Sequence, residues 1–308
     1  MASFHSSHGL LLIVVLISSL QFNLKAEPVK ELFPFPYHGG PLLSGNIPVN
    51  LIWYGQFSPT QRAIVLDFIA SLSKPTAEQP SVASWMNLTA KFYQVTTIPD
   101  SLVLSLGKEV LDENYSLGKS LTSAQLYKLA KKGGEDNLIN VLLTSADVTV
   151  EGFCQGRCGT HALGTGPMHG NTNSKFNYIW VGNSEIQCPG LCAWPFHESI
   201  NGPKTPPLKA PNGDFGLDGM VINVASLLAG TVTNPFGNGF FQGPQEAPLE
   251  ASTACPGVFG KGAYPGFAGT LLVDSKTGAS YNANGINGKK YLLPAMMDPE
   301  TSTCTTLV

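Results

Sequence analysis

The most informative stretch of the chain spans residues 218–243 and reads DGMVINVASLLAGTVTNPFGNGFFQG. Its apolar residues recur on a single helical face, at Val221, Val224, Leu228 and Val232. Asp218 is expected to cap the N-terminus, and Asn234 to end the helix because it precedes a proline. We therefore predict a long buried helix that ends in a turn at Pro235.

This helix resembles the active-site helix of several secreted zinc metallopeptidases, in which H-E-x-x-[HE] runs into a V-T-[DN]-P turn. The turn is present at residues 232–235. Ser226 stands in place of the first His, Leu227 in place of the general-base Glu, and Gly230 in place of the last ligand. A catalytic zinc ion needs about three protein ligands, and these side chains supply none. The resemblance implies a metallopeptidase scaffold that has lost its metal site, whereas the alternative is a plain buried helix.

The composition is that of a secreted globular protein. The 308 residues are 43% hydrophobic and only 13% charged, which indicates a large core under a lightly charged surface. A formal net charge of −3 provides no basic footprint, so nucleic acid is not expected as a partner. The 33 glycines and 23 prolines predict many shaped loops.

The first 26 residues have the features of a signal peptide. The run LLLIVVLISSL at residues 10–20 is too short to span a membrane and is followed by a cleavage pattern that ends at Ala26. No later segment is long and apolar enough for a span. We expect a secreted protein whose residues 27–308 form a single domain.

The six cysteines all follow this signal, and an even number in an oxidising compartment favours disulfides. Cys154/Cys158 and Cys188/Cys192 form two C-x3-C pairs, which either close local rings or cross-link to each other. Cys255 and Cys304 remain as the third expected pair. A zinc site of four thiolates is the alternative, although C-x3-C is not its usual spacing. Two N-x-[ST] sequons, at Asn87 and Asn114, predict N-glycosylation on the surface.

Local patterns predict a mixture of strands and helices. Strands are expected at residues 49–54, 101–106, 138–144 and 176–181, with short ones at 270–273 and 290–293. Helices are expected at residues 58–72, 82–94 and 122–132, ahead of the long helix from Met220. The order of these elements predicts an α/β or α+β fold with a mixed sheet, a zincin-like core and an irregular Gly/Pro-rich C-terminal lobe.

The chain as a whole resembles the plant EXORDIUM, or phosphate-induced protein, family. The segments that carry the resemblance follow in order: YHGGPLL at 37–43, IWYG at 52–55, YIWVGN at 178–183, CAWPFH at 192–197, APNGD at 210–214, DGMV at 218–221, TNPF at 233–236, GAYPG at 262–266, YLLPA at 291–295 and TC at 303–304. The resemblance implies a protein of the apoplast or cell wall that takes part in growth control, including brassinosteroid-dependent cell expansion. It implies no catalytic residues and no cofactor.

Three histidines and two acids are the polar candidates for a cleft. His161, His169 and His197 are of a type that binds zinc, but none has a partner four residues away on a helix, so the alternative is histidines in loops. Glu198 and Asp214 could form the acid/base pair of a glycosidase, with Asp218 nearby, although caps and turns are the usual role of acids in such loops.

Aromatic residues near Gly and Pro offer a different kind of site. Phe240, Phe241 and Tyr264 would suit a sugar or a peptide if their faces were exposed, because aromatic rings give a large contact area at a small entropy cost. The alternative is that they anchor loops to the core.

Two functions of different classes follow. The first is a non-catalytic extracellular protein that binds a wall polysaccharide, a peptide or a receptor, without a metal. The second is a divergent hydrolase, either a metallopeptidase or a glycosidase, which requires convergent ligands in a cleft beside the helix from Met220. The missing H-E-x-x-[HE] residues favour the first.

Overall fold

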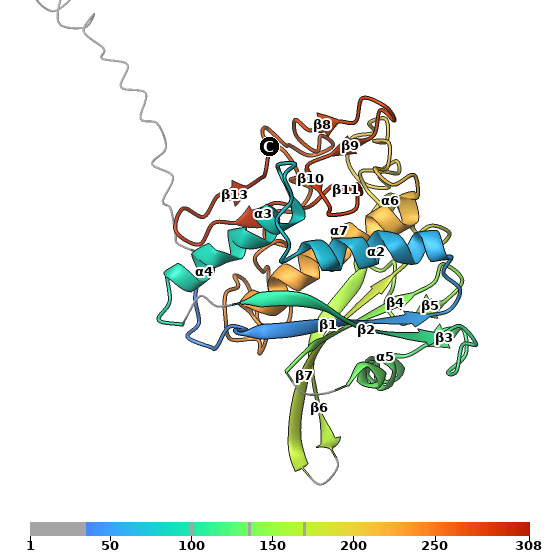
Figure 1. Ribbon diagram of the computed structural model, residues 1–308, viewed down its shortest axis with the longest axis vertical. Coiled ribbons are helices and arrows are strands. Elements are labelled where there is room, and N and C mark those ends of the chain that lie inside the picture. The colour runs from blue at the N-terminus through green and yellow to red at the C-terminus, as the bar shows by residue number, and fades with distance from the viewer. Residues whose placement is uncertain (1–34, 99–101, 135–136, 169–170) are drawn as a thin grey trace, which may run out of the picture. The chain divides into compact units, whose positions relative to one another are not determined.

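A five-stranded mixed sheet organises the protein in the computed structural model (Figure 1), which describes residues 35–98, 102–134, 137–168 and 171–308, without the side chains of residues 165–174. The strand order is β2-β1-β4-β7-β6. The strands are β1 (Asn46–Tyr54), β2 (Val103–Asp112), β4 (Ile139–Thr144), β6 (Gly159–Met168) and β7 (Asn171–Gly182). The first four in this order run parallel, and β6 closes one edge antiparallel to β7. The predicted mixed α/β architecture is therefore confirmed.

The central strands are buried on both faces of the sheet. Every residue of β4 is buried, which explains why its sequence INVLLT is mostly apolar, with Asn140 and Thr144 as buried polar residues. Val141 and Leu143 belong to the main core on one face, whereas Leu142 faces a second cluster that includes Trp180. This alternation follows from the two-residue period of a strand.

Helices cover both faces of the sheet (Figure 1). One face carries α2 (Pro59–Ser71), α3 (Val82–Met86), α4 (Ala90–Gln94) and α7 (Phe215–Thr233), and the other carries α5 (Ser123–Ala130). Ser58 and Thr122 cap α2 and α5 through reciprocal capping boxes, so both predicted starts are confirmed. The helix predicted at residues 82–94 is broken into α3, the 3-10 turn η1 (Asn87–Thr89) and α4.

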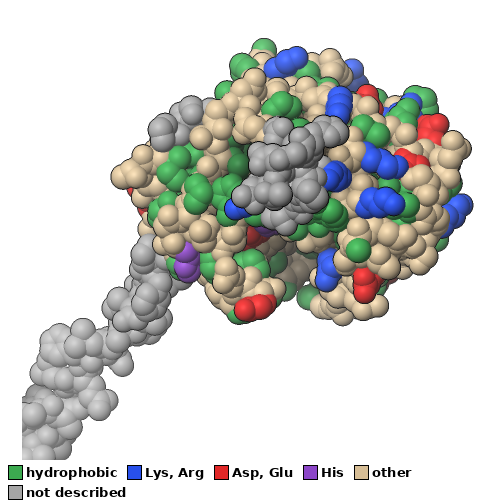
Figure 2. All heavy atoms as spheres, turned by 90° about the horizontal axis from the view of Figure 1, so that it is seen from below, with side chains coloured by type: hydrophobic (Ala, Val, Ile, Leu, Met, Phe, Trp, Pro, Cys, Tyr) green, Lys and Arg blue, Asp and Glu red, His purple; other side chains and the backbone are tan. Residues whose placement is uncertain are grey.

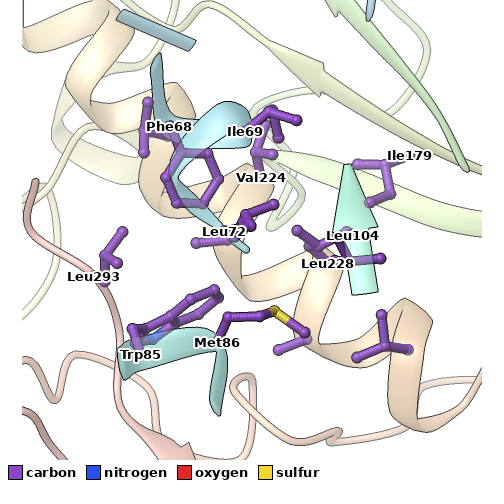
Figure 3. Packing of buried hydrophobic residues seen from close by; sticks show 14 of the residues in the cluster. Phe68, Ile69, Leu72, Trp85, Met86, Leu104, Ile179, Val224, Leu228 and Leu293 are labelled. Carbon is purple, nitrogen blue, oxygen red and sulfur yellow. The ribbon is translucent and has the colours of Figure 1, made fainter. Parts of the chain in front are cut away.

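The long helix α7 lies at the centre of the main core. Val224 and Leu228 face Phe68 of α2 and Leu72, the residue that follows α2 (Figure 3), and all four predicted apolar positions are buried. The expected cap was wrong. Asp214 caps the helix by accepting a hydrogen bond from the Leu217 amide, since the Asp218 carboxylate already accepts from Asn212.

Beyond α7 the chain forms loops and two-residue strands. These are β8 (Leu272–Val273), β9 (Ser280–Tyr281), β10 (Ala283–Asn284), β11 (Lys290–Tyr291), β12 (Met296–Met297) and β13 (Cys304–Thr305). Another two-residue pair, β3 (Ser120–Leu121) with β5 (Thr149–Val150), precedes α7 in the chain and lies near α5. The predicted irregular C-terminal region is therefore confirmed, and it packs on the α7 side of the sheet (Figure 1).

Three disulfides close this fold. Cys154 pairs with Cys188 and Cys158 with Cys192, so the two C-x3-C pairs cross-link to each other. Cys255 pairs with Cys304, as expected. The first two bonds join the loop before β6 to α6 (Pro189–Cys192), and Asn223 of α7 donates to the Cys192 carbonyl. The start of β6 is thereby fixed to the core helix.

Edge strand β6 was not predicted. Its sequence GTHALGTGPM contains three glycines and a proline, has no aromatic residue, and offers only two threonines as β-branched residues, so it lacks the pattern that marks a strand. The expectation of loop histidines was wrong for His161, which lies on β6 opposite Ile179. Gly164 is required by close packing, because a Cβ there would lie 2.5 Å from the Phe176 ring.

The surface carries charges of both signs. Lys and Arg side chains are more numerous on one half of the underside, with Asp and Glu among them (Figure 2). In the described part of the chain, α7 is the one helix long and apolar enough to cross a membrane, and 78% of its apolar window is buried in the protein. It is accordingly the core helix, and no clear membrane span is found among these residues.

Candidate binding groove

A groove runs beside α7, with β6 and the preceding loop on one side and residues 252–259 on the other. It consists of three adjoining hollows of about 460, 320 and 300 Å3. The first two share Gly159, Leu227 and Thr253 in their walls, and the last two share Pro256 and Gly257. The shared wall residues place the three hollows next to one another along α7.

Two of the three degenerate metal-site positions form the floor of this groove. Ser226 and Leu227 are half-buried, and both line the central hollow, while Leu227 also packs against the edge of the main core. Gly230 is buried one turn further on. Of the three positions, Ser226 and Leu227 therefore face the groove and Gly230 does not line it.

The space above Gly230 is filled by a hydrogen-bonded pair. His161 Nε2 lies 2.7 Å from Glu250 Oε2, and a Cβ on Gly230 would lie 2.4 Å from that oxygen and 3.4 Å from the same nitrogen. Glu250 is buried and also accepts from the Asn234 side-chain amide at 2.7 Å. Asn234 in turn accepts from the Gly239 amide at 2.7 Å. Glycine is needed at position 230 because any larger residue would displace the pair.

This network fixes the imidazole. An ionised carboxylate only accepts, so His161 donates from Nε2 and its other ring nitrogen keeps a lone pair while the ring is neutral. The His161 side chain is 15% exposed at the wall of the first hollow. Glu250 and Asn234 were not predicted as site residues. Asn234 belongs to the quoted V-T-N-P turn, but nothing in the sequence marks Glu250.

The other predicted polar residues do not join His161. His197 contacts the Glu198 carbonyl through Nδ1 at 3.1 Å, and the Glu198 carboxylate is exposed beside Lys204. Asp214 is occupied as the helix cap. His169 lies outside the described residues. Within the described ranges, no group of three His, Cys, Asp or Glu side chains could hold a metal ion.

The predicted aromatic residues divide in two. Phe240 and Phe241 are both buried: Phe240 belongs to the main core and contacts Phe92, whereas Phe241 is covered by the stacked ring of His38. Tyr264 is 65% exposed and lines the third hollow with Trp194. Tyr264 and Trp194 are therefore the candidate aromatic residues for ligand contact in the third hollow.

Comparison with known proteins assigns the chain to a class. Residues 35–307 match the family described as the phosphate-induced protein 1 conserved region. The chain belongs to this family. It is 62% identical over 287 residues to Protein PHOSPHATE-INDUCED 1 of Nicotiana tabacum, covering 92% of this chain and 91% of that one. It is 59% identical to Protein EXORDIUM of Arabidopsis thaliana, covering 97% of each chain. The predicted EXORDIUM family membership is confirmed, and no solved structure matches the chain.

Proposed function

We propose that this chain is a secreted protein of the plant apoplast or cell wall that regulates growth and cell expansion by binding, without catalysis. Its target would be a wall polysaccharide, a peptide or a receptor, held in the groove beside α7, and its action would be linked to brassinosteroid response. The names of the relatives are consistent with a plant growth-related protein. The three disulfides indicate an extracellular or secreted protein.

One observation supports binding over catalysis. The helix positions that would hold a metal and a general base are Ser226, Leu227 and Gly230, and the volume above Gly230 is taken by His161 and Glu250, which satisfy each other. A groove with such a floor retains shape and polar edges but lacks the side chains of a metallopeptidase.

The scaffold itself supports a zincin-like origin. Helix α7 combines a degenerate H-E-x-x-[HE] segment and a V-T-N-P turn with an antiparallel edge strand beside it. Superposition of an experimental structure on zinc metallopeptidases tests this origin. The proposal of a common ancestor fails unless α7 and β6 can be superposed together with the active-site helix and its neighbouring strand.

Two measurements test the proposed binding function. Protein secreted in glycosylated form and purified without chelator should contain no stoichiometric zinc and should not turn over peptide or glycoside substrates. In plants that lack a related protein, Ser226→Trp should fail to restore cell length because the indole fills the central hollow, whereas Ser226→Ala should restore it. Stoichiometric zinc, turnover, or full rescue by Ser226→Trp would each contradict the proposal.

A second candidate function is a divergent hydrolase that uses His161 as a general base. The observation in its favour is the hydrogen bond that His161 donates to Glu250, since an imidazole held by a carboxylate is oriented for proton transfer. This candidate predicts turnover that His161→Gln removes. If the wild-type protein turns over neither peptide nor glycan substrates, the hydrolase is contradicted and the binding function is the remaining candidate.

Surface exposure is compatible with glycosylation at both sequons. Asn87 on η1 and Asn114 after β2 are exposed, so an oligosaccharide could be attached at either. We propose that both are used and that residues 27–308 form one domain after removal of a signal peptide, residues 1–26, which lies outside the described residues. To test glycosylation, the secreted protein is treated with an N-glycosidase, which should decrease its mass. The double variant with Asn87→Gln and Asn114→Gln should show no decrease.

A further inference from the structure

We propose that the free edge of β6 binds an extended peptide as an additional strand of the sheet, with a basic side chain of that peptide beside Glu246 and Glu250. This inference rests on the proposed binding function and narrows its ligand to one class. It follows from which backbone groups the edge strand leaves unpaired and from the charges along the groove.

The hydrogen-bond register identifies those backbone groups. The Gly182 amide donates to the Cys158 carbonyl at 3.3 Å, so this opposed pair is hydrogen-bonded. Bonded and non-bonded pairs alternate along an antiparallel ladder. Gly159, His161 and Leu163 are therefore the residues whose amides and carbonyls point away from β7, toward the groove.

These groups have few partners within the described residues. The Thr160 hydroxyl approaches the His161 carbonyl at 3.2 Å, and no other hydrogen bond reaches the outward groups of the three residues in the described ranges. Edge strands normally protect such groups by Pro, by a bulge or by an inward charge. Between residues 159 and 164, β6 has no Pro and no register shift, and the side chain of His161 is already paired.

The spacing of these groups sets the length of the ligand. Outward residues recur every second position, or about 6.7 Å, so residues 159–163 match about five residues of an extended peptide. Each outward residue offers one donor and one acceptor, which is the pattern that a peptide backbone complements and a polysaccharide does not.

Charge gives the groove two different ends. The ionisable side chains that line the first hollow are His161, Glu246 and Glu250, and Glu246 is exposed, with no ion pair to another described residue. Arg157 is the one ionisable side chain that lines the central hollow. The complementary peptide has a basic residue at the Glu246 end and an acidic group toward Arg157.

A library selection tests the proposal on the disulfide-bonded secreted protein. The probe is a pool of N-acetylated, C-amidated random hexapeptides. Selected binders should favour Lys or Arg at one position, and Glu246→Lys should change that preference to Asp or Glu. Methylation of the binder's amides, one at a time, should weaken binding about tenfold or more at every second residue and little at those between.

Two matched variants separate an edge effect from misfolding. Leu163→Pro removes an outward amide and none of the ladder to β7, so it should weaken peptide binding about tenfold or more. Leu163→Val keeps that amide and should bind as the wild type does. Equal thermal unfolding of both variants is the control for folding.

The outcomes distinguish this inference from the proposed function. No selected binder, binders insensitive to N-methylation, or full binding by Leu163→Pro would overturn the edge-strand proposal. Binding of pectin or xyloglucan oligomers instead, lost in Ser226→Trp, would overturn it while leaving the binding function intact. Zinc-dependent turnover would contradict the proposed function itself.

Discussion

Glu250 Oε2 and His161 Nε2 lie 2.7 Å apart in the space that a side chain at Gly230 would occupy. A residue from the loop after α7 and a residue from the edge strand thus meet over the helix position where the resemblance would place a metal ligand. Glu250 is held from its other side by Asn234. The pair joins three segments of the groove, so its loss should affect both stability and groove shape.

Removal of the buried carboxylate should be costly. Glu250→Ala leaves the Asn234 amide and the His161 ring without their shared acceptor and should lower the free energy of unfolding by about 3–5 kcal/mol. Glu246→Ala changes an exposed carboxylate in the same groove and should stay within about 0.5 kcal/mol of the wild type. Urea denaturation of both measures the difference, and equal losses would contradict a structural role for the pair.

Gly230→Ala should destabilise the protein although alanine is the better helix former. At a solvent-exposed position in a helix, the change would raise the free energy of unfolding by about 1 kcal/mol. Here, however, the new Cβ would lie 2.4 Å from Glu250 Oε2. We expect a net loss of about 1–3 kcal/mol from the overpacking. In the double variant with Glu250→Ala, the added cost of Gly230→Ala should largely vanish. Additive losses in this double-mutant cycle would show that the two positions do not compete for space.

Much of the sheet could be predicted from the sequence because its central strands are buried on both sides. β4 is mostly apolar, and the caps at Ser58 and Thr122 are local signals that depend on a few neighbouring residues. Edge strand β6 could not be predicted in the same way. Its glycines are required by contacts with residues distant in the sequence, such as the contact of Gly164 with the Phe176 ring, and a local sequence pattern does not reveal such contacts.

The site could be predicted only in part for the same reason. The degenerate helix positions and His161 were identified because the motif and the residue type mark them. Glu250 is brought to His161 across 89 residues of chain, and its selection depends on the packing of a loop without periodicity. Glu198 and Asp214 were considered as a catalytic pair from their residue type alone. In the structure, Glu198 forms a surface ion pair with Lys204, and Asp214 caps α7.

The disulfide between Cys158 and Cys192 should protect the groove locally. Because Cys154–Cys188 already joins the same two segments, this bond closes a ring of only about ten further residues, so its removal should cost about 2–3 kcal/mol. In Cys158→Ser with Cys192→Ser, amide hydrogen exchange should rise first in residues 159–163. In Cys255→Ser with Cys304→Ser, the rise should be centred on the opposite wall and the C-terminal tail. Identical exchange patterns in the two double variants would contradict separate roles.

Stability should fall as pH rises because of Asp218. Burial raises the pKa of this carboxyl and outweighs the hydrogen bonds from Asn212, and the neighbouring Asp214 raises it further, to about 7. Between about pH 4 and pH 7 the folded protein therefore holds a proton that the unfolded chain has released, so the free energy of unfolding decreases with increasing pH. A shift of about three pKa units corresponds to at most about 4 kcal/mol over this range.

Asp218→Asn should flatten this dependence, since the amide stays neutral at every pH. Urea unfolding at pH 4, 5.5 and 7 should give a wild-type stability that declines and a variant stability that changes much less. Asp214→Asn is the matched control: asparagine caps a helix about as well as aspartate, so this variant should keep most of the slope. Parallel curves for wild type and Asp218→Asn would show that the buried carboxyl stays ionised through this range, with Asn212 compensating for its burial.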